Sequence, residues 1–337
     1  FFSLLLQVVV GMPSKRKADN NAEAPPAKAL KIDGIEFLQA SLKAVYGMEF
    51  PGEMFLIWEV ACEACAEDPL NAFKAFGVRL VGPFEILAAK EFAEGSKPHI
   101  HWRFPYDPPE FMTLMVGPDR HWGYFRDDPA EMPVLVASGK TDSHAFIVED
   151  HLLVSALCKI CTPTGKKNTG PSALAEALQK KMDLHGLKRG DAAKTYTARN
   201  RQSIGAPFHK MGLVVPYDTK TEVGYRDLGR TPAEFKSMLE KVSGKGPVSQ
   251  SLRNEFDTLL TFVDVANDEC DFGHGLEVGL DLFCFASLDG AAKCELHAHC
   301  LRILDMAYML LNRSLYQQII NDHMGCRNRA ELAERMD

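Results

Sequence analysis

Three carboxylates at the end of an apolar, helix-like segment are the side chains in this chain best suited to chemistry. Asp268, Glu269 and Asp271 lie in the stretch NDECDFGHGLEVGLDLFC (267–284), directly after residues 252–266, whose apolar positions recur at helical spacing. Continuing that helix by three residues would put Glu269 on its apolar face. A charged glutamate is not packed into a core without a partner. Either the helix therefore stops near residue 267, or Glu269 lies at the rim of a pocket.

Both arrangements place Glu269 near a helix C-terminus, where the helix dipole disfavours the anion and so favours proton uptake. A carboxylate in that position suits a general base. Three acids also depart from the usual preference for Lys or Arg at a helix end, and such departures concentrate at functional sites. Two other interpretations stay open: a solvated acidic turn, and a calcium or magnesium site that also uses Glu277. The spacing of the acids does not match an EF-hand loop.

The other metal-binding residue types form weaker patterns. The nine cysteines are odd in number, and the two C-x-x-C pairs, at 62–65 and 158–161, fall in helix-like segments rather than in turns. In CELHAHC (294–300), four possible ligands cannot converge from one helix. His99 and His101 would lie on one face of an expected strand, as partly exposed side chains. We therefore expect no metal site, and we expect the cysteines to be reduced thiols of an intracellular protein.

Size and charge limit the classes of function. The 337 residues are 46% hydrophobic, which suffices for one large or two ordinary domains. The net charge is −7, and because residues 12–31 carry a positive surplus, the remainder is more acidic than the whole chain. An acidic body argues against direct nucleic-acid binding, which needs basic surface, and favours a basic partner. The sequence contains no P-loop, no G-x-G-x-x-G and no G-x-S-x-G.

Residues 1–33 are expected to be a disordered, basic tail. The apolar run 1–11 is too short to span a bilayer and lacks the basic flank of a signal peptide, so Met12 resembles a natural start and residues 1–11 an addition that is not native. The cluster SKRK (14–17) is compatible with nuclear import.

Two domains are expected to follow the tail, at 34–148 and at 149–337. The first combines helices near 35–45 and 53–66 with consecutive short strands that predict an antiparallel meander, at 99–104, 111–117, 121–126, 133–138 and 144–148. In the second we expect a polar connection up to residue 201 after the first helices, and then strands at 212–217, 222–228 and 276–285 among helices. Helices are expected at 231–243, 252–266 and 303–319. The predicted class is α+β, each domain carrying a mostly antiparallel sheet with packed helices.

Six blocks give the chain a resemblance to a known family. In order, over about residues 35–325, they are LVGPFEILAAK (80–90), HWRFPYDPPEF (101–111), GYFRDDPAEMP (123–133), FHKMGLVVP (208–216), VGYR (223–226) and TFVDVANDECDFGHGLEVGLDLFC (261–284). With these blocks the chain resembles the histone PARylation factor family.

The resemblance implies a nuclear accessory factor of the poly(ADP-ribose) polymerases that are activated by DNA damage. Such a factor is not an enzyme on its own. It binds the catalytic domain of the polymerase at damaged chromatin and completes an active site that transfers ADP-ribose from NAD to serine hydroxyls, notably in histones. It also curbs chain elongation. NAD would be bound by the polymerase, so no cofactor is expected on this chain, and neither nucleic acid nor membrane is an expected partner.

The family's functional residues carry over to four positions of this chain. Glu269 matches the catalytic glutamate and would be the general base on the acceptor serine. Asp268 matches an aspartate that contacts the polymerase. Tyr225 and Arg226 match the pair in VGYR, and Arg226 would hold the interface and steady the acids by charge pairing. Asp271 and Glu277 receive no role from the resemblance and are interpreted as structural or solvated acids.

Two departures limit this transfer. The segment 285–306 is longer than in the family and has a different composition, so contacts there are not carried over. Val265 stands where a phenylalanine of the interface is expected. Residues 12–33 also lack the cysteine and histidine of a zinc-binding tail module that some relatives carry. Two alternatives are retained: a non-catalytic acidic module that only docks a basic nuclear partner, and an independent metal-dependent enzyme.

Overall fold

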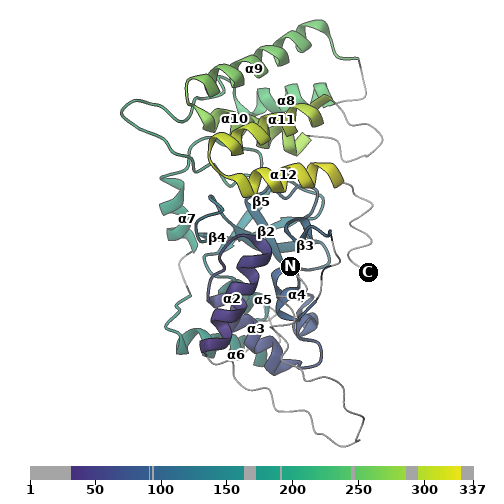
Figure 1. Ribbon diagram of the computed structural model, residues 1–337, viewed down its shortest axis with the longest axis vertical. Coiled ribbons are helices and arrows are strands. Elements are labelled where there is room, and N and C mark those ends of the chain that lie inside the picture. The colour runs from purple at the N-terminus through teal and green to yellow at the C-terminus, as the bar shows by residue number, and fades with distance from the viewer. Residues whose placement is uncertain are drawn as a thin grey trace, which may run out of the picture.

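The computed structural model describes residues 32–90, 92, 95–162, 172–189, 192–243, 247–285 and 295–327. The expected tail at 1–33 lies almost wholly outside these residues. Figure 1 shows three levels along the long axis: the helices α2 to α6 at one end, an antiparallel sheet in the middle, and the helices α8 to α12 at the other end. None of the described helices is long and apolar enough to cross a membrane.

The first half contains the sheet and the helices beside it. Its helices are α2 (Ile32–Tyr46), α3 (Glu53–Ala64), α4 (Pro83–Leu87), α5 (Leu153–Ile160) and α6 (Ala173–Leu184), with the helical turns η1 (Pro69–Asn71), η2 (Lys74–Phe76) and η3 (Pro98–Ile100). Its strands are β1 (Arg79–Leu80), β2 (Phe111–Val116), β3 (Arg120–Phe125), β4 (Leu135–Lys140) and β5 (Phe146–Asp150). The strands pair antiparallel in sequence order, so the predicted meander is confirmed.

The strand predicted at 99–104 is wrong. These residues form η3 and a turn, in which Trp102 adopts a left-handed conformation with φ 59°. The cause is a buried acid: the Glu85 carboxylate accepts a hydrogen bond from Nε1 of Trp102 at 2.9 Å and lies 2.6 Å from Nε2 of His101. Bringing two adjacent side chains to one carboxylate requires a turn, because neighbouring side chains of a strand point to opposite faces.

The second half is helical. A side helix, α7 (Ala192–Asn200), leads to an irregular segment and then to α8 (Pro232–Ser243), α9 (Gln250–Asp268), α10 (Phe272–Phe285), α11 (Glu295–Leu310) and α12 (Ser314–Cys326). The strands predicted at 212–217 and 222–228 are wrong, since only the isolated bridges Ile204–Leu213 and Asp218–Val223 occur there. The strand predicted at 276–285 belongs to α10. The α+β class is confirmed, but within the described residues its only multi-stranded sheet lies in the first half.

Two large hydrophobic cores organise these elements, and two smaller apolar clusters lie beside the sheet. The first is built by α2, α3, the sheet, α5 and α6, and the second by α8 to α12. The α5 and α6 helices therefore pack with the first core, although a boundary at residue 148 would assign them to the second half. The expected polar connection up to residue 201 includes α7, whose buried Arg199 donates from Nε to Asp127 Oδ2 at 2.8 Å.

Candidate functional site

The acids singled out by the sequence lie where α9 ends. The last turn is closed by two backbone hydrogen bonds, from Cys270 N–H to Asn267 O at 3.2 Å and from Asp271 N–H to Ala266 O at 2.8 Å. Cys270 has φ 67°, so the pair forms the left-handed termination called a Schellman motif. Glu269 is the C-cap residue. The helix thus stops before Glu269 could reach the apolar face, and its side chain is 53% exposed.

The segment 223–226 is held against the first turn of α10 by close backbone contact. Gly273 N–H donates to Gly224 O at 2.9 Å, and a Cβ on Gly273 would meet that same oxygen at 2.9 Å. Gly224 itself has φ 119°, a conformation that side-chain-bearing residues rarely adopt. These two glycines allow the loop to approach α10 so closely, and the approach brings the next residues, Tyr225 and Arg226, to the end of α9.

Arg226 connects two of the three acids. Its Nη2 donates to the Glu269 carboxylate and lies 3.0 Å from Oδ2 of Asp271. Asp271 is buried, and its Oδ1 accepts the N–H of Gly224 at 2.9 Å. The hydrogen bond to Glu269 raises the pKa of Arg226 above its ordinary value. The expected charge pairing is thus present, and the buried Asp271 is the second acid in it, which the sequence analysis missed.

His274 binds the backbone of the loop 223–226. Its Nδ1 lies 2.9 Å from the carbonyl oxygen of Arg226, to which it donates. Burial, together with the nearby Arg226 guanidinium, lowers the pKa of His274, so the ring is neutral near pH 7. The carbonyl and the guanidinium of Arg226 are therefore both fixed by groups of the α9–α10 junction.

Tyr225 has a different environment from Arg226. Its hydroxyl donates to Oε2 of Glu277 at 2.6 Å, and the other oxygen of Glu277 accepts the N–H of Ala206 at 2.7 Å. Burial raises the pKa of Glu277. One turn further along α10, Asp281 accepts the N–H of Phe208 at 2.7 Å. These acids secure the irregular segment before α8, and the Tyr225 hydroxyl is occupied in that structural role.

Asp268 is exposed on the last turn of α9, and its carboxylate makes no hydrogen bond or ion pair within the described part of the chain. Two apolar side chains of the same helix are also exposed, Phe262 at 55% and Val265 at 39%. The outer face of α9 therefore combines acidic and apolar groups beside Glu269. Phe262 belongs to this outer face and not to the inner stripe suggested by the helical spacing of 252–266.

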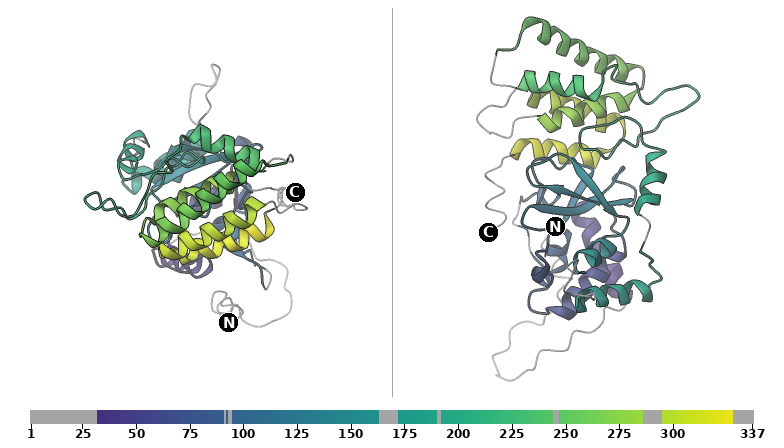
Figure 2. Two further views of the ribbon diagram at one scale, coloured as in Figure 1. Left: turned by 90° about the horizontal axis from the view of Figure 1, so that it is seen from above. Right: turned by 180° about the vertical axis from the view of Figure 1, so that it is seen from behind.

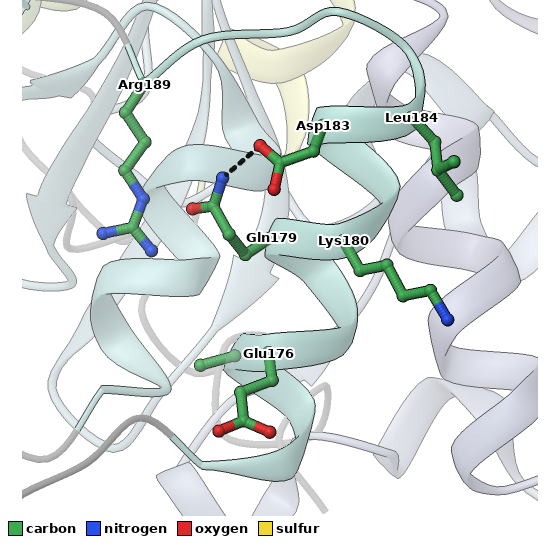
Figure 3. Close-up of a pocket in the computed structure, with 7 residues that line it drawn as sticks. Glu176, Gln179, Lys180, Asp183, Leu184 and Arg189 are labelled. Carbon is green, nitrogen blue, oxygen red and sulfur yellow. Dashed lines mark hydrogen bonds between the residues drawn. The ribbon is translucent and has the colours of Figure 1, made fainter.

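The site offers no cavity of its own among the pockets that the described residues form most clearly. A shallow pocket on α6 has a volume of about 460 Å³. Figure 3 shows the residues that line it: Glu176, Gln179, Lys180, Asp183, Leu184 and Arg189, together with Ala175. It belongs to the first half of the molecule, and its charges are mixed in sign. Within the described residues, no group of three or more His, Cys, Asp or Glu side chains is arranged to hold a metal ion. What Glu269 presents is a single held carboxylate on an open surface.

Comparison with known proteins assigns the chain to a family. The sequence profile of the family described as Histone PARylation factor 1 matches residues 38–327. The chain belongs to this family. Histone PARylation factor 1 of Mus musculus and that of Danio rerio are each 32% identical to the chain, over 93% of both sequences. A putative histone PARylation factor 1-like protein of Homo sapiens is 30% identical over 94% of both.

Membership of the histone PARylation factor 1 family supports the role of a histone PARylation factor for this chain. The matched region contains both hydrophobic cores, the loop 223–226 and the acids at the end of α9. The resemblance found from six blocks is thereby confirmed as family membership. The roles of Glu269, Asp268, Tyr225 and Arg226 stay predictions, and the geometry separates them: Glu269, Asp268 and Arg226 are exposed, whereas Tyr225 is half-buried.

Proposed function

We propose that this chain is an accessory factor that docks on the catalytic domain of a poly(ADP-ribose) polymerase and supplies Glu269 to a joint active site. The observation that carries the proposal is the state of Glu269, an exposed carboxylate held by Arg226 on an open surface. On this proposal Glu269 would supply one half of the active site. The other half, with NAD in it, would belong to the polymerase.

Glu269 would act as the general base on an acceptor serine. As the serine oxygen attacks the anomeric carbon of the nicotinamide ribose, its proton passes to the Glu269 carboxylate. A carbon–oxygen bond forms, the carbon–nitrogen bond breaks, and nicotinamide leaves with the electron pair of that bond. A protonated serine hydroxyl is a weak nucleophile, so a positioned base accelerates the step, typically by about 10²–10⁴-fold.

Arg226 would position this base. Asp271 is buried and anchors the guanidinium from one side, which leaves the Glu269 carboxylate on the exposed side of the same group. A cation fixed in this way restricts the rotamers of the carboxylate before the partner arrives. Asp268, next to it, would dock the polymerase directly. Tyr225 would contribute through its ring, since its hydroxyl is bonded to Glu277.

The substrate class follows from charge. The net charge of −7 and the acids near Glu269 suit Lys- and Arg-rich segments such as histone tails. Such a factor would act in the nucleus, on chromatin at sites of DNA damage. The family names of the relatives refer to histones and PARylation, and this role agrees with them.

A reconstitution with Glu269→Gln tests the proposal. The assay contains the chain, a DNA-activated polymerase, NAD and a histone-tail peptide, and serine modification is mapped while binding to the polymerase is measured separately. We expect Glu269→Gln to bind like wild type and to lose serine modification by about 10²-fold or more. Glu255→Gln, at an exposed acid on the same helix, is the matched control and should be fully active.

Unchanged serine modification by Glu269→Gln, with binding intact, would show that the chain is a non-catalytic acidic docking module. Loss of activity on addition of EDTA, together with a metal that copurifies, would instead favour an independent metal-dependent enzyme.

A further inference from the structure

A second exposed apolar surface lies on α11. Met306 is 40% exposed and Met309 47% exposed, and both lie on the same helical face as Arg302, four and seven residues earlier. Methionine is flexible and polarisable, and exposed methionines are common on surfaces that adapt to a protein partner. We call Met306 and Met309 the α11 methionine pair.

Two contacts between α9 and α11 place this pair beside the candidate site. Nη1 of Arg302 lies 3.1 Å from Oδ1 of Asp264, and the rings of Phe256 and His299 pack edge to face with centroids 5.5 Å apart. Both contacts advance along α9 and α11 in the same sense, so the two helices run parallel, and each of them packs against α10. Figure 1 agrees, because the C-terminal ends of α9 and α11 lie at the same end of the helical layer.

The methionine pair is therefore level with the acids. From the Asp264–Arg302 contact, Asp268 is four residues further along α9 and Met306 four residues further along α11, an advance of about 6 Å along each axis. Met309 lies one turn beyond, towards the start of α10. Asp268 and Met306 therefore lie at the same level along two neighbouring helices.

We infer that the docking surface for the polymerase catalytic domain extends from the end of α9 to α11 and includes Met306 and Met309. This inference rests on the proposed function. A joint active site must exclude water around Glu269, so the partner has to cover the surface on both sides of the acids. Apolar side chains bordered by Asp268 fit a folded patch that carries apolar residues next to Lys or Arg. A histone tail fits less well, because it is rich in basic residues and poor in large apolar ones.

Hydroxyl-radical oxidation of the wild-type chain tests the inference without a substitution. Met132, 46% exposed in the first half, is an internal control of matched exposure. With saturating polymerase catalytic domain, we expect oxidation of Met306 and Met309 to fall severalfold while that of Met132 is unchanged. Unprotected methionines in a complex that still modifies serine would overturn the inference, and so would protection by a histone-tail peptide alone.

A double variant gives an independent measurement. Met306→Glu with Met309→Glu would place unpaired charge in the interface, and we expect the Kd for the polymerase to rise by about tenfold or more. Ile147→Glu, at a 54% exposed residue of β5, is the control and should bind like wild type. Wild-type affinity in the double variant would contradict the inference about the methionine pair and would leave the proposed function standing. If the wild-type chain fails to bind the polymerase at all, the proposed function falls as well.

Discussion

At the scale of single residues, the site depends on how one arginine is shared. Arg226 contacts the buried Asp271 and the exposed Glu269, so the same guanidinium has a structural and a candidate catalytic partner. The sequence indicated that an acid at a helix end was unusual, and the resemblance alone singled out Glu269. The sequence could not reveal that Asp271, two residues later, turns inward, because that depends on the left-handed conformation of Cys270 between them.

Tyr225 and Arg226 are adjacent in sequence, and we predict that they contribute differently to stability. Tyr225→Phe should lower the free energy of unfolding by about 2 kcal/mol, because it removes a hydrogen bond from the buried carboxylate of Glu277. Arg226→Gln should change it by less than about 1 kcal/mol, since its pair with Glu269 is largely exposed and its buried partner Asp271 keeps the hydrogen bond from the Gly224 N–H. Urea denaturation of both variants measures the two values. Equal losses would contradict this separation of roles.

At the scale of secondary structure, α10 explains why the strand predicted at 276–285 was wrong and how the loop beside the site is held in place. All residues from Gly273 to Cys284 are buried, so the helix lacks the polar face that normally reveals a period of 3.6. Its acids, Glu277 and Asp281, instead cap backbone N–H groups of the preceding loop. Apolar and polar residues then alternate in LEVGLDLFCF as they would in a half-buried strand. By contrast, β2 to β5 were predicted correctly because turn residues separate them.

The end of α9 offers a prediction about this element. Cys270 occupies the left-handed position of the Schellman motif, where glycine is the usual residue because a Cβ is strained there. Cys270→Gly should therefore raise the free energy of unfolding by about 0.5–1 kcal/mol and leave the position of Glu269 unchanged. Chemical denaturation measures the gain, with Cys270→Ala as the control that keeps the Cβ. A lower stability for the glycine variant than for the alanine variant would refute this account.

At the scale of the whole molecule, the helices α8 to α12 lie beyond the sheet and its helices (Figure 2), and buried polar contacts join the two halves. The Tyr308 hydroxyl of α11 donates to Glu110 Oε1 at 2.8 Å, and the Tyr316 hydroxyl of α12 donates to the carbonyl of Arg126 at 2.8 Å. Such contacts join residues far apart in the chain, so local patterns do not reveal them. The sequence accordingly predicted the fold class, while the assignment of α5 and α6 to the first core required the structure.

The chain passes between the two cores at His209, and this residue should make stability depend on pH. Its carbonyl accepts the N–H of Phe146 at 3.1 Å, and its Nδ1 accepts the N–H of Met211 at 3.1 Å. Burial, reinforced by the charge of Arg199, lowers the pKa of His209 to about 3. In the unfolded chain the His209 ring takes up a proton near pH 6.5, whereas the buried ring stays neutral. The contribution of His209 to the free energy of unfolding is therefore complete above pH 6.5 and is lost as the pH falls.

Between pH 8 and pH 5 the free energy of unfolding should fall by about 2 kcal/mol because of this one residue. His209→Asn keeps an acceptor for the Met211 N–H and cannot take up the proton, so its free energy of unfolding should fall by about 2 kcal/mol less over that range. Urea denaturation at both pH values measures the slope, which is independent of any constant destabilisation of the variant. His185→Asn, at an exposed residue, should retain the wild-type slope. A wild-type slope in His209→Asn would show that the buried ring does not control this pH dependence.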